Sequence, residues 1–182
     1  MNIYEKCPLL ESEWFILRAV YRTDCEDLVK VYGDKNALPF FNSDNCHGDN
    51  FYYATRERME QALDFWEMSY ENGWFARLSI VDKPAACVIG TVELCLRDSE
   101  NLGILRIDVR SDYEREDALY EIASLITPQI PEYFGCDGVI TKAPIYAVER
   151  IKALEKCGYS KYDEYIIGEN GYAYDGYWIY NT

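Results

Sequence analysis

The stretch LGILRIDVRSDYEREDALYEIASL, residues 102–125, decides the fold. Its first part alternates apolar and polar residues, which is the period of two expected of a half-buried strand. Leu105, Ile107 and Val109 would face one side of a sheet, and the charged residues between them would face the other. A charged loop follows, and apolar residues return at the spacing of one helix face from Leu119 onward. A helix that begins directly after a strand presents its free backbone amides at one place, and such helix ends often bind anions.

Two further β-rich segments precede this stretch, at residues 74–81 and 86–96, and a tight turn joins them. With the strand at 102–109 they predict three consecutive antiparallel strands. Gly90 inside the second segment suggests a β-bulge. Helices are predicted at 55–71, 117–127 and 146–156, with a short one ending at residue 33, and strands at 15–20, 139–142, 161–167 and 172–180.

The order of these elements predicts an α/β (α+β) fold. A central mixed sheet with helices on both faces accommodates it. The sequence contains no internal repeat, low-complexity segment or linker, so we expect a single domain over residues 1–182.

The acidic balance of the chain limits its partners. With 18 Lys and Arg against 32 Asp and Glu, the formal net charge is −14. Because nucleic-acid binding needs clustered positive charge, we expect no nucleic-acid partner. Negative charge favours cationic small molecules or amines, although it also serves solubility alone. No apolar run is long enough to span a membrane, and the first residues do not resemble a signal peptide, so we expect a cytoplasmic protein with no membrane partner.

Metal sites and disulfides are not expected. The seven cysteines have no C-x-x-C spacing and are odd in number, which indicates reduced thiols. The single histidine, His47, lies in an irregular segment at residues 34–53 and makes a zinc site improbable. We therefore expect no metal.

Two short motifs resemble a known enzyme family. Residues 153–159, ALEKCGY, are similar to the helix end V-L-E-K-x-G-F of the GNAT superfamily of N-acetyltransferases, and residues 89–94, IGTVEL, to its strand I-G-x-x-x-L. Together with the order of the elements, the resemblance covers residues 15 to 180. It implies a GNAT-like central sheet that is mixed, mostly antiparallel and twisted, with about six to seven strands.

The family moves an acetyl group from acetyl-CoA to an amine. The resemblance thus implies acetyl-CoA as cofactor and direct attack by a primary amine of a small molecule or peptide. It assigns acetyl-CoA contacts to the strand end, the loop after it and two helix starts: Ile107, Val109, Arg110, Glu114, Arg115, Glu116, Asp117, Ala118, Ala147 and Arg150.

The loop after the strand departs from the family's pyrophosphate motif, R/Q-x-x-G-x-G/A. The expected arginine falls on Glu114, and the expected glycines fall on Arg115, Asp117 and Leu119. Glycine lets the backbone approach a pyrophosphate because it has no Cβ, and these residues lack that property. Three carboxylates, those of Glu114, Glu116 and Asp117, would face a dianion, and each such contact could cost ~1 to a few kcal/mol.

A local explanation exists for the same acids. Ser111 and Glu114 have the spacing of a capping box. If the helix begins at Ser111, its free amides are satisfied from within, and Asp112, Glu114 and Glu116 complement the helix dipole by roughly 0.3–1 kcal/mol each. The positive helix end would then be occupied by the protein's own acids, with Arg115 as a nearby cation.

Two carboxylates on neighbouring strands, Glu93 and Asp108, are candidate catalytic bases. Acetyl transfer needs a base to take the proton of the amine and a backbone amide, here near Val109 or Arg110, to polarise the carbonyl. Glu93, Asp108 and Arg106 could line a cleft. They are explained equally well as structural acid–arginine pairs across strands.

Tyr146 is a candidate catalytic acid or orienting group. The family often carries an asparagine early in the later helix and a tyrosine near its end, and these positions hold Ala147 and Leu154. With 17 tyrosines in the chain, packing is the commoner explanation for any one of them. The tyrosine-rich hairpin at residues 161–180 could form a homodimer surface if it is exposed.

Two functions from different classes follow. One is an acetyl-CoA-dependent N-acetyltransferase with an altered phosphate loop. The other is a GNAT-fold protein that has lost CoA binding and serves as a ligand-binding or interaction module. In the second case the groove between the fourth and fifth family strands is expected to be closed or filled by side chains.

Overall fold

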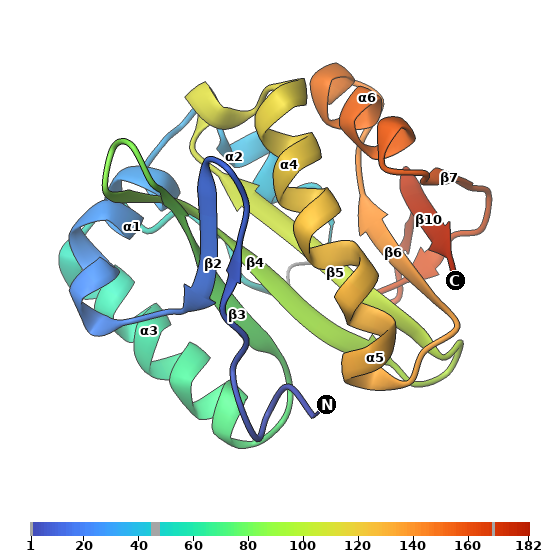
Figure 1. Ribbon diagram of the computed structural model, residues 1–182, viewed down its shortest axis with the longest axis horizontal. Helices are drawn as coiled ribbons and strands as arrows, with labels where there is room; N and C mark the ends of the chain where they lie inside the picture. The colour runs from blue at the N-terminus through green and yellow to red at the C-terminus, as the bar shows by residue number, and fades with distance from the viewer. Residues whose placement is uncertain (1, 45–47, 169) are drawn as a thin grey trace.

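The structure is a computed structural model that describes residues 2–44, 48–168 and 170–182. Its framework is a sheet of eight strands in the order β1-β2-β3-β4-β5-β6-β10-β7, with a separate β8–β9 hairpin (Figure 1). All neighbouring strands run antiparallel except β5 and β6, which run parallel. The strands are β1 Leu10–Glu11, β2 Phe15–Ala19, β3 Ala76–Asp82, β4 Cys87–Arg97, β5 Leu102–Val109, β6 Gly138–Lys142, β7 Ser160–Tyr162, β8 Ile166–Ile167, β9 Ala173–Tyr174 and β10 Tyr177–Asn181.

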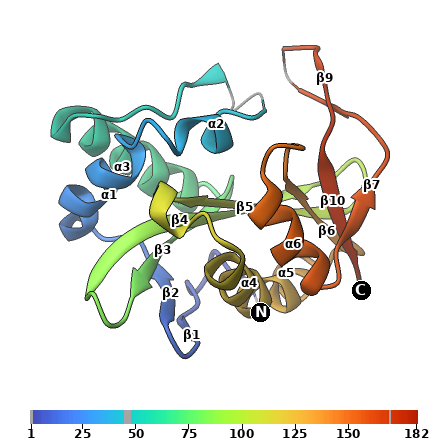
Figure 2. The same cartoon turned by 90° about the horizontal axis from the view of Figure 1, so that it is seen from above.

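Helices cover both faces of the sheet. Figure 2 shows α1, α2 and α3 on one side and α4, α5 and α6 on the other. The helices are α1 Cys25–Tyr32, α2 Leu38–Phe41, α3 Arg56–Glu71, α4 Glu116–Ile126, α5 Ile130–Phe134 and α6 Val148–Lys156. None of the helices within the described residues has both the length and the apolarity needed to cross a membrane.

The alternation of residues along the strands gives the sheet two different faces. One face presents apolar residues such as Leu78, Val92 and Leu105 to α4, α5 and α6. The other face is polar in its centre, where Glu93 of β4 is paired with Arg77 of β3 and with Arg106 of β5. A functional site can form on this polar face, because α1 and α3 cover only part of it.

β5 extends beyond its parallel neighbour β6. The paired register runs from Leu102 and Gly138 to Leu105 and Thr141. β5 then continues to Val109, whereas β6 ends at residue 142. We call the gap beside residues 106–109 of β5 the splay. Backbone groups along it need partners that β6 does not supply.

The structure confirms the predicted fold class and the antiparallel arrangement of β3, β4 and β5. The main sheet has eight strands rather than six to seven, because β1 adds a strand of two residues at one edge. The C-terminal tyrosine-rich hairpin divides: β7 and β10 join the main sheet, and β8 and β9 pair separately. Glu169 in its turn lies outside the described residues, as does His47.

The predicted capping box at Ser111 is wrong. Residues 111–113 form a short 3₁₀ turn, and α4 begins at Glu116. The Ser111 amide donates to Asp34 Oδ2 at 2.8 Å, and the Glu114 carboxylate binds Arg150 instead of reaching back to the Ser111 backbone. Ser111 and Glu114 thus bind residues that are distant in the sequence, which a local sequence pattern cannot predict.

The predicted bulge is present beside Gly90. The register between β3 and β4 shifts after the Ile80–Gly90 pair. A Cβ on Gly90 would lie 2.2 Å from the Asp108 carbonyl oxygen and 2.9 Å from the Val109 Cα. Both are backbone atoms of β5, so the strand itself would have to move.

We expect Gly90→Ala to destabilise the protein by about 1–3 kcal/mol, as overpacking does in a filled core. For a chain of this length, each kcal/mol shifts the melting temperature by about 2–4 °C. Thermal denaturation followed by circular dichroism measures the effect. An unchanged melting temperature would show that β5 is not held against Gly90.

Candidate functional site

A cavity of about 220 Å³ lies beside the splay, on the polar face of the sheet. β4, β5 and β6 form its floor, and residues 40–44 and the β8–β9 hairpin form its walls. Of the predicted site residues, the structure brings Glu93, Asp108, Ile107 and Arg150 to this cavity. We call it the splay cavity.

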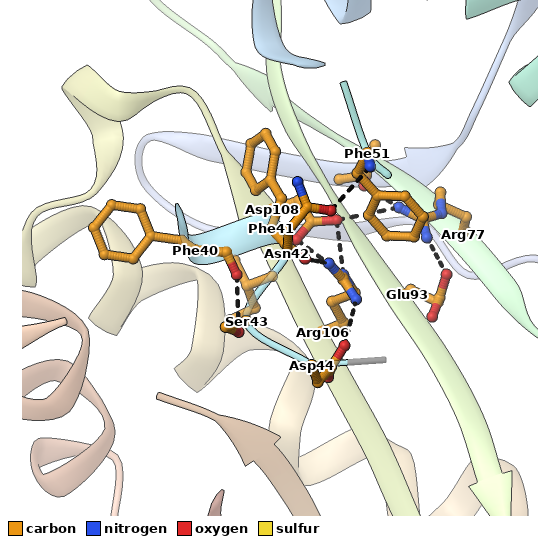
Figure 3. A network of polar contacts seen from close by, with 12 residues as sticks. Phe40, Phe41, Asn42, Ser43, Asp44, Phe51, Arg77, Glu93, Arg106 and Asp108 are labelled. Atoms are coloured by element: carbon orange, nitrogen blue, oxygen red, sulfur yellow. Dashed lines mark hydrogen bonds and ion pairs between the residues drawn. The ribbon is translucent and has the colours of Figure 1, made fainter. Parts of the chain in front are cut away.

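Arg77 of β3 binds both candidate bases. Its Nη2 donates to Glu93 Oε2, and its Nη1 lies 3.4 Å from Asp108 Oδ2 (Figure 3). Its guanidinium also stacks 4.3 Å from the ring centroid of Trp66. Burial alone would lower the pKa of Arg77, but Glu93, Tyr32 and Asp108 outweigh it and hold that pKa above its ordinary value. The arginine therefore stays charged.

The two candidate bases differ in how fully they are occupied. Asp108 accepts from Arg106 Nε at 3.0 Å and from the Tyr32 hydroxyl at 3.2 Å, in addition to Arg77. Glu93, within the described part of the chain, accepts only at Oε2. Glu93 Oε1 thus receives no hydrogen bond from a described residue, whereas both oxygens of Asp108 accept one.

Arg106 is folded along its own strand. Besides Asp108 it donates to the Phe41 carbonyl, and its guanidinium lies 4.3 Å from the ring centroid of Phe51. Figure 3 shows its guanidinium between Phe41 and Asp44, and it lies 3.4 Å from Asp44 Oδ1. Its contacts fix residues 41–44 over the sheet and so shape one wall of the cavity.

Arg150 of α6 occupies the splay. Its Nη1 donates to the Ile107 carbonyl at 2.8 Å, a group for which β6 offers no partner. Its Nε and Nη2 bind the two oxygens of Glu114 at 2.8 Å and 2.7 Å, and both side chains are 7% exposed. Burial would lower the pKa of Arg150, but the Glu114 carboxylate raises it above its ordinary value. The two residues form a buried, bidentate ion pair.

The other cations near the start of α4 are also bound by acids. Arg110 binds Asp112 through contacts of 2.6 Å and 2.8 Å, and this arginine lowers the pKa of the Asp112 carboxyl. Arg115, which precedes α4, binds Asp117 at 2.8 Å. Acidic side chains thus surround the first turn of α4, where Glu116 lies and Ala118 is buried.

The remaining predicted residues lie outside the lining of the splay cavity. The Arg110 amide donates to the Ile89 carbonyl at 2.9 Å, so it is not available to polarise a ligand. Val109 lies opposite Gly90 as a non-hydrogen-bonded pair, so its amide points to the same side as the Ile107 carbonyl, toward the splay. The Tyr146 hydroxyl donates to the Pro39 carbonyl at 2.6 Å, outside the cavity lining, and buried Ala147 caps α6. Their roles stay predictions.

Comparison with solved structures identifies the architecture. The chain superposes on spermidine N-acetyltransferase from Vibrio cholerae, solved with CoA and spermine, with a TM-score of 0.70 and 11% identity over 93% of this chain and 96% of that one. It superposes on ribosomal-protein-S5-alanine acetyltransferase from Vibrio fischeri with a TM-score of 0.68 and 15% identity over 94% of each chain. A GNAT-family acetyltransferase from Bacillus anthracis gives 0.71 at 12% identity over 96% and 98%.

The chain has the GNAT fold. At the level of sequence, no protein-family profile matches it, and no curated protein is similar to it. Identities of 11% to 15% establish the fold alone.

The residues at the GNAT phosphate position do not fit the pyrophosphate of CoA. Glu114 and Arg150 neutralise each other, so neither offers an unpaired charge. Arg115 is bound to Asp117, and the residues at the expected glycine positions all carry a Cβ. The Ile107 carbonyl on the strand edge is bonded to Arg150. The cations of this loop are thus bound by acids, whereas the first turn of α4 has no side-chain cap on its backbone amides.

Sequence reasoning missed several site residues. Arg77 and Tyr32 lie on elements read only as a strand and a helix, and Lys142 was placed only as the end of a strand. The one signal for Arg77 was a charged residue within the apolar segment WFARLSIV. Arg77 faces Glu93 of β4 only because of the register between β3 and β4 across the bulge, and the sequence does not reveal that register.

Within the described residues, no group of three or more His, Cys, Asp and Glu side chains is arranged to hold a metal ion. The described cysteines are all unpaired thiols. Cys46 lies outside the described residues.

We expect Arg150→Ala to destabilise the protein by about 3–5 kcal/mol, because it leaves the buried Glu114 carboxylate without a counter-charge. Lys152→Ala is the matched control: its pair with Glu149 is 2.7 Å long but about half exposed, so its loss should cost under about 1 kcal/mol. Replacing the buried pair together, as Arg150→Met with Glu114→Leu, should recover most of the loss. Equal melting temperatures for Arg150→Ala and Lys152→Ala would contradict a buried pair.

Proposed function

We propose that this GNAT-fold chain binds a small amine in the splay cavity and has lost the binding of acetyl-CoA that acetyltransferases of the fold use. One observation carries the proposal: the Arg150–Glu114 pair fills the splay and binds the strand edge at the Ile107 carbonyl. A ligand entering there would have to break a buried ion pair, at a cost of several kcal/mol.

An amine suits the other end of the cavity. Glu93 lines it with one carboxylate oxygen that receives no hydrogen bond from any described residue. An ammonium group placed there would form a charge-assisted hydrogen bond. The net charge of −14 attracts cations toward the protein from a distance.

An acetyl-CoA-dependent N-acetyltransferase is the second candidate. What favours it is the parallel pair β5–β6 that ends early, with a cavity and a carboxylate beside the gap. The solved structures of the same fold are N-acetyltransferases, of spermidine in one case and of a ribosomal protein in another. In this candidate the Arg150–Glu114 pair would have to open before CoA could bind.

Thermal denaturation with acetyl-CoA separates the two candidates. A ligand at 100 times its dissociation constant adds ~2.7 kcal/mol to the free energy of unfolding, which is about 5–10 °C here. We expect no shift at millimolar acetyl-CoA. A saturable rise, with release of free thiol in the presence of an amine, would overturn our proposal and favour the enzyme.

A variant designed to regain acetyl-CoA binding tests the proposal in the opposite direction. Glu114→Arg with Arg115→Gly, Asp117→Gly and Arg150→Asn restores a family-like loop and removes the paired cation from the splay. Leu119 is kept, because it is 1% exposed and part of the core. We expect this folded variant to show an acetyl-CoA-dependent rise in melting temperature that the parent lacks. If it shows none, the loop and the Arg150–Glu114 pair are not the cause of the loss.

A further inference from the structure

Lys142 is the cation of the splay cavity that has no acidic partner within the described residues. Arg106 binds Asp108, Arg150 binds Glu114, and Arg97 binds Glu100. Lys142 Nζ instead donates to the backbone carbonyl of Asp175 and lies 4.8 Å from the ring centroid of Tyr177. An ammonium has three donors, so two stay available to an acceptor from the cavity.

The partial burial of Lys142 also favours an anionic partner for its ammonium group. Desolvation is the main cause that lowers the pKa of Lys142, and nearby Asp44 and Asp175 only partly offset it. A half-buried ammonium gains more from a carboxylate than an exposed one does, because water screens the pair less. The cavity therefore contains an ammonium without an acidic partner at Lys142 and, at Glu93, a carboxylate oxygen that receives no hydrogen bond from a described residue.

The register places these two groups at one level of the sheet. Glu93 pairs with Arg106, and Leu105 pairs with Thr141, so Glu93, Arg106 and Lys142 lie across three adjacent strands. Paired strands are spaced about 4.8 Å apart, so the backbones of β4 and β6 are about 10 Å apart at the Leu105–Thr141 pair and diverge beyond it. A ligand that bridges Glu93 and Lys142 therefore carries both an ammonium and a carboxylate. Arg106 lines the cavity between them, and its guanidinium is bound by Asp108, Asp44 and the Phe41 carbonyl.

The remaining wall is apolar. Ile104, Ile140 and Ile166 line the cavity together with the rings of Tyr174 and Tyr177. Ile140, Ile166 and Tyr177 belong to one small hydrophobic cluster beneath the β8–β9 hairpin. A ligand body that contacts this wall would be apolar, as most ligand pockets require.

From these features we infer that the splay cavity takes a zwitterion of the amino-acid class with an apolar side chain. Its ammonium binds Glu93 Oε1, its carboxylate binds Lys142, and its side chain lies against the isoleucines and tyrosines. This inference rests on the proposed binding of an amine and adds the carboxylate and the apolar body.

Two sets of ligands, each with a shared carbon skeleton but different charged groups, test this inference. L-Phenylalanine carries both charges, phenethylamine lacks the carboxylate, and 3-phenylpropionate lacks the ammonium; L-leucine, isopentylamine and 4-methylpentanoate form a second set with a smaller body. Calorimetric titration of the full chain should show the amino acid of at least one set binding at least tenfold more tightly than both analogues. Equal binding of the amine, or no binding in either set, would overturn the inference.

Two variants assign the ends of the site. Lys142→Met keeps the aliphatic stem and should abolish the preference for the amino acid over the amine, while the amine still binds. Glu93→Gln should abolish the preference over the carboxylic acid. Lys161→Met removes an exposed lysine of β7 and should change neither. An unchanged preference in a folded Lys142→Met protein would contradict the role of Lys142, whatever acetyl-CoA does in the test of the proposed function.

Discussion

A single buried guanidinium, that of Arg77, determines how the polar face of the sheet can be covered. It lies between Glu93 and Asp108, under Trp66 of α3, and only compensation by those carboxylates makes its burial tolerable. Tyr32 of α1 completes the arrangement by sharing its hydroxyl with Arg77 and Asp108. The helices that cover this face are thus attached to it by hydrogen bonds as well as by apolar packing. A change in this network is therefore expected to affect stability as well as binding.

The sequence predicted what depends on local periodicity. The alternation at residues 105–109 correctly assigned the faces of β5 and placed Asp108 on the polar one, and Glu93 of the neighbouring strand lies on the same face. It could not show that Arg77 would bind both, because that depends on the register of β3 against β4. Nor could it show that Arg150 would cross from α6 to β5, since a lysine or arginine early in a helix is usually solvated. The missed residues are those whose partners lie far away in the chain.

The splay shows how the protein itself can satisfy a strand edge that a shorter neighbouring strand leaves open. In a parallel sheet the exposed edge of a longer strand needs hydrogen-bond partners, and these can come from a ligand or from the protein. Here Arg150 provides one for Ile107, and Glu114 neutralises the charge that Arg150 brings. Glu114, which lies in the loop at the phosphate position of the fold, thus supplies the counter-ion of Arg150. This ion pair connects the altered motif in the sequence with the filled gap in the structure.

The strand order at the C-terminal edge has a consequence for the folding of the chain. β10 lies between β6 and β7, and β7 pairs with no strand but β10 in the described part of the sheet. A ribosome makes β7 first, so it has no edge to pair with until residues 177–181 have emerged. Until then the edge of β6 is open to other chains, which is the hazard that any unpaired strand carries. The sheet is therefore completed by a late insertion rather than by stepwise growth from one side.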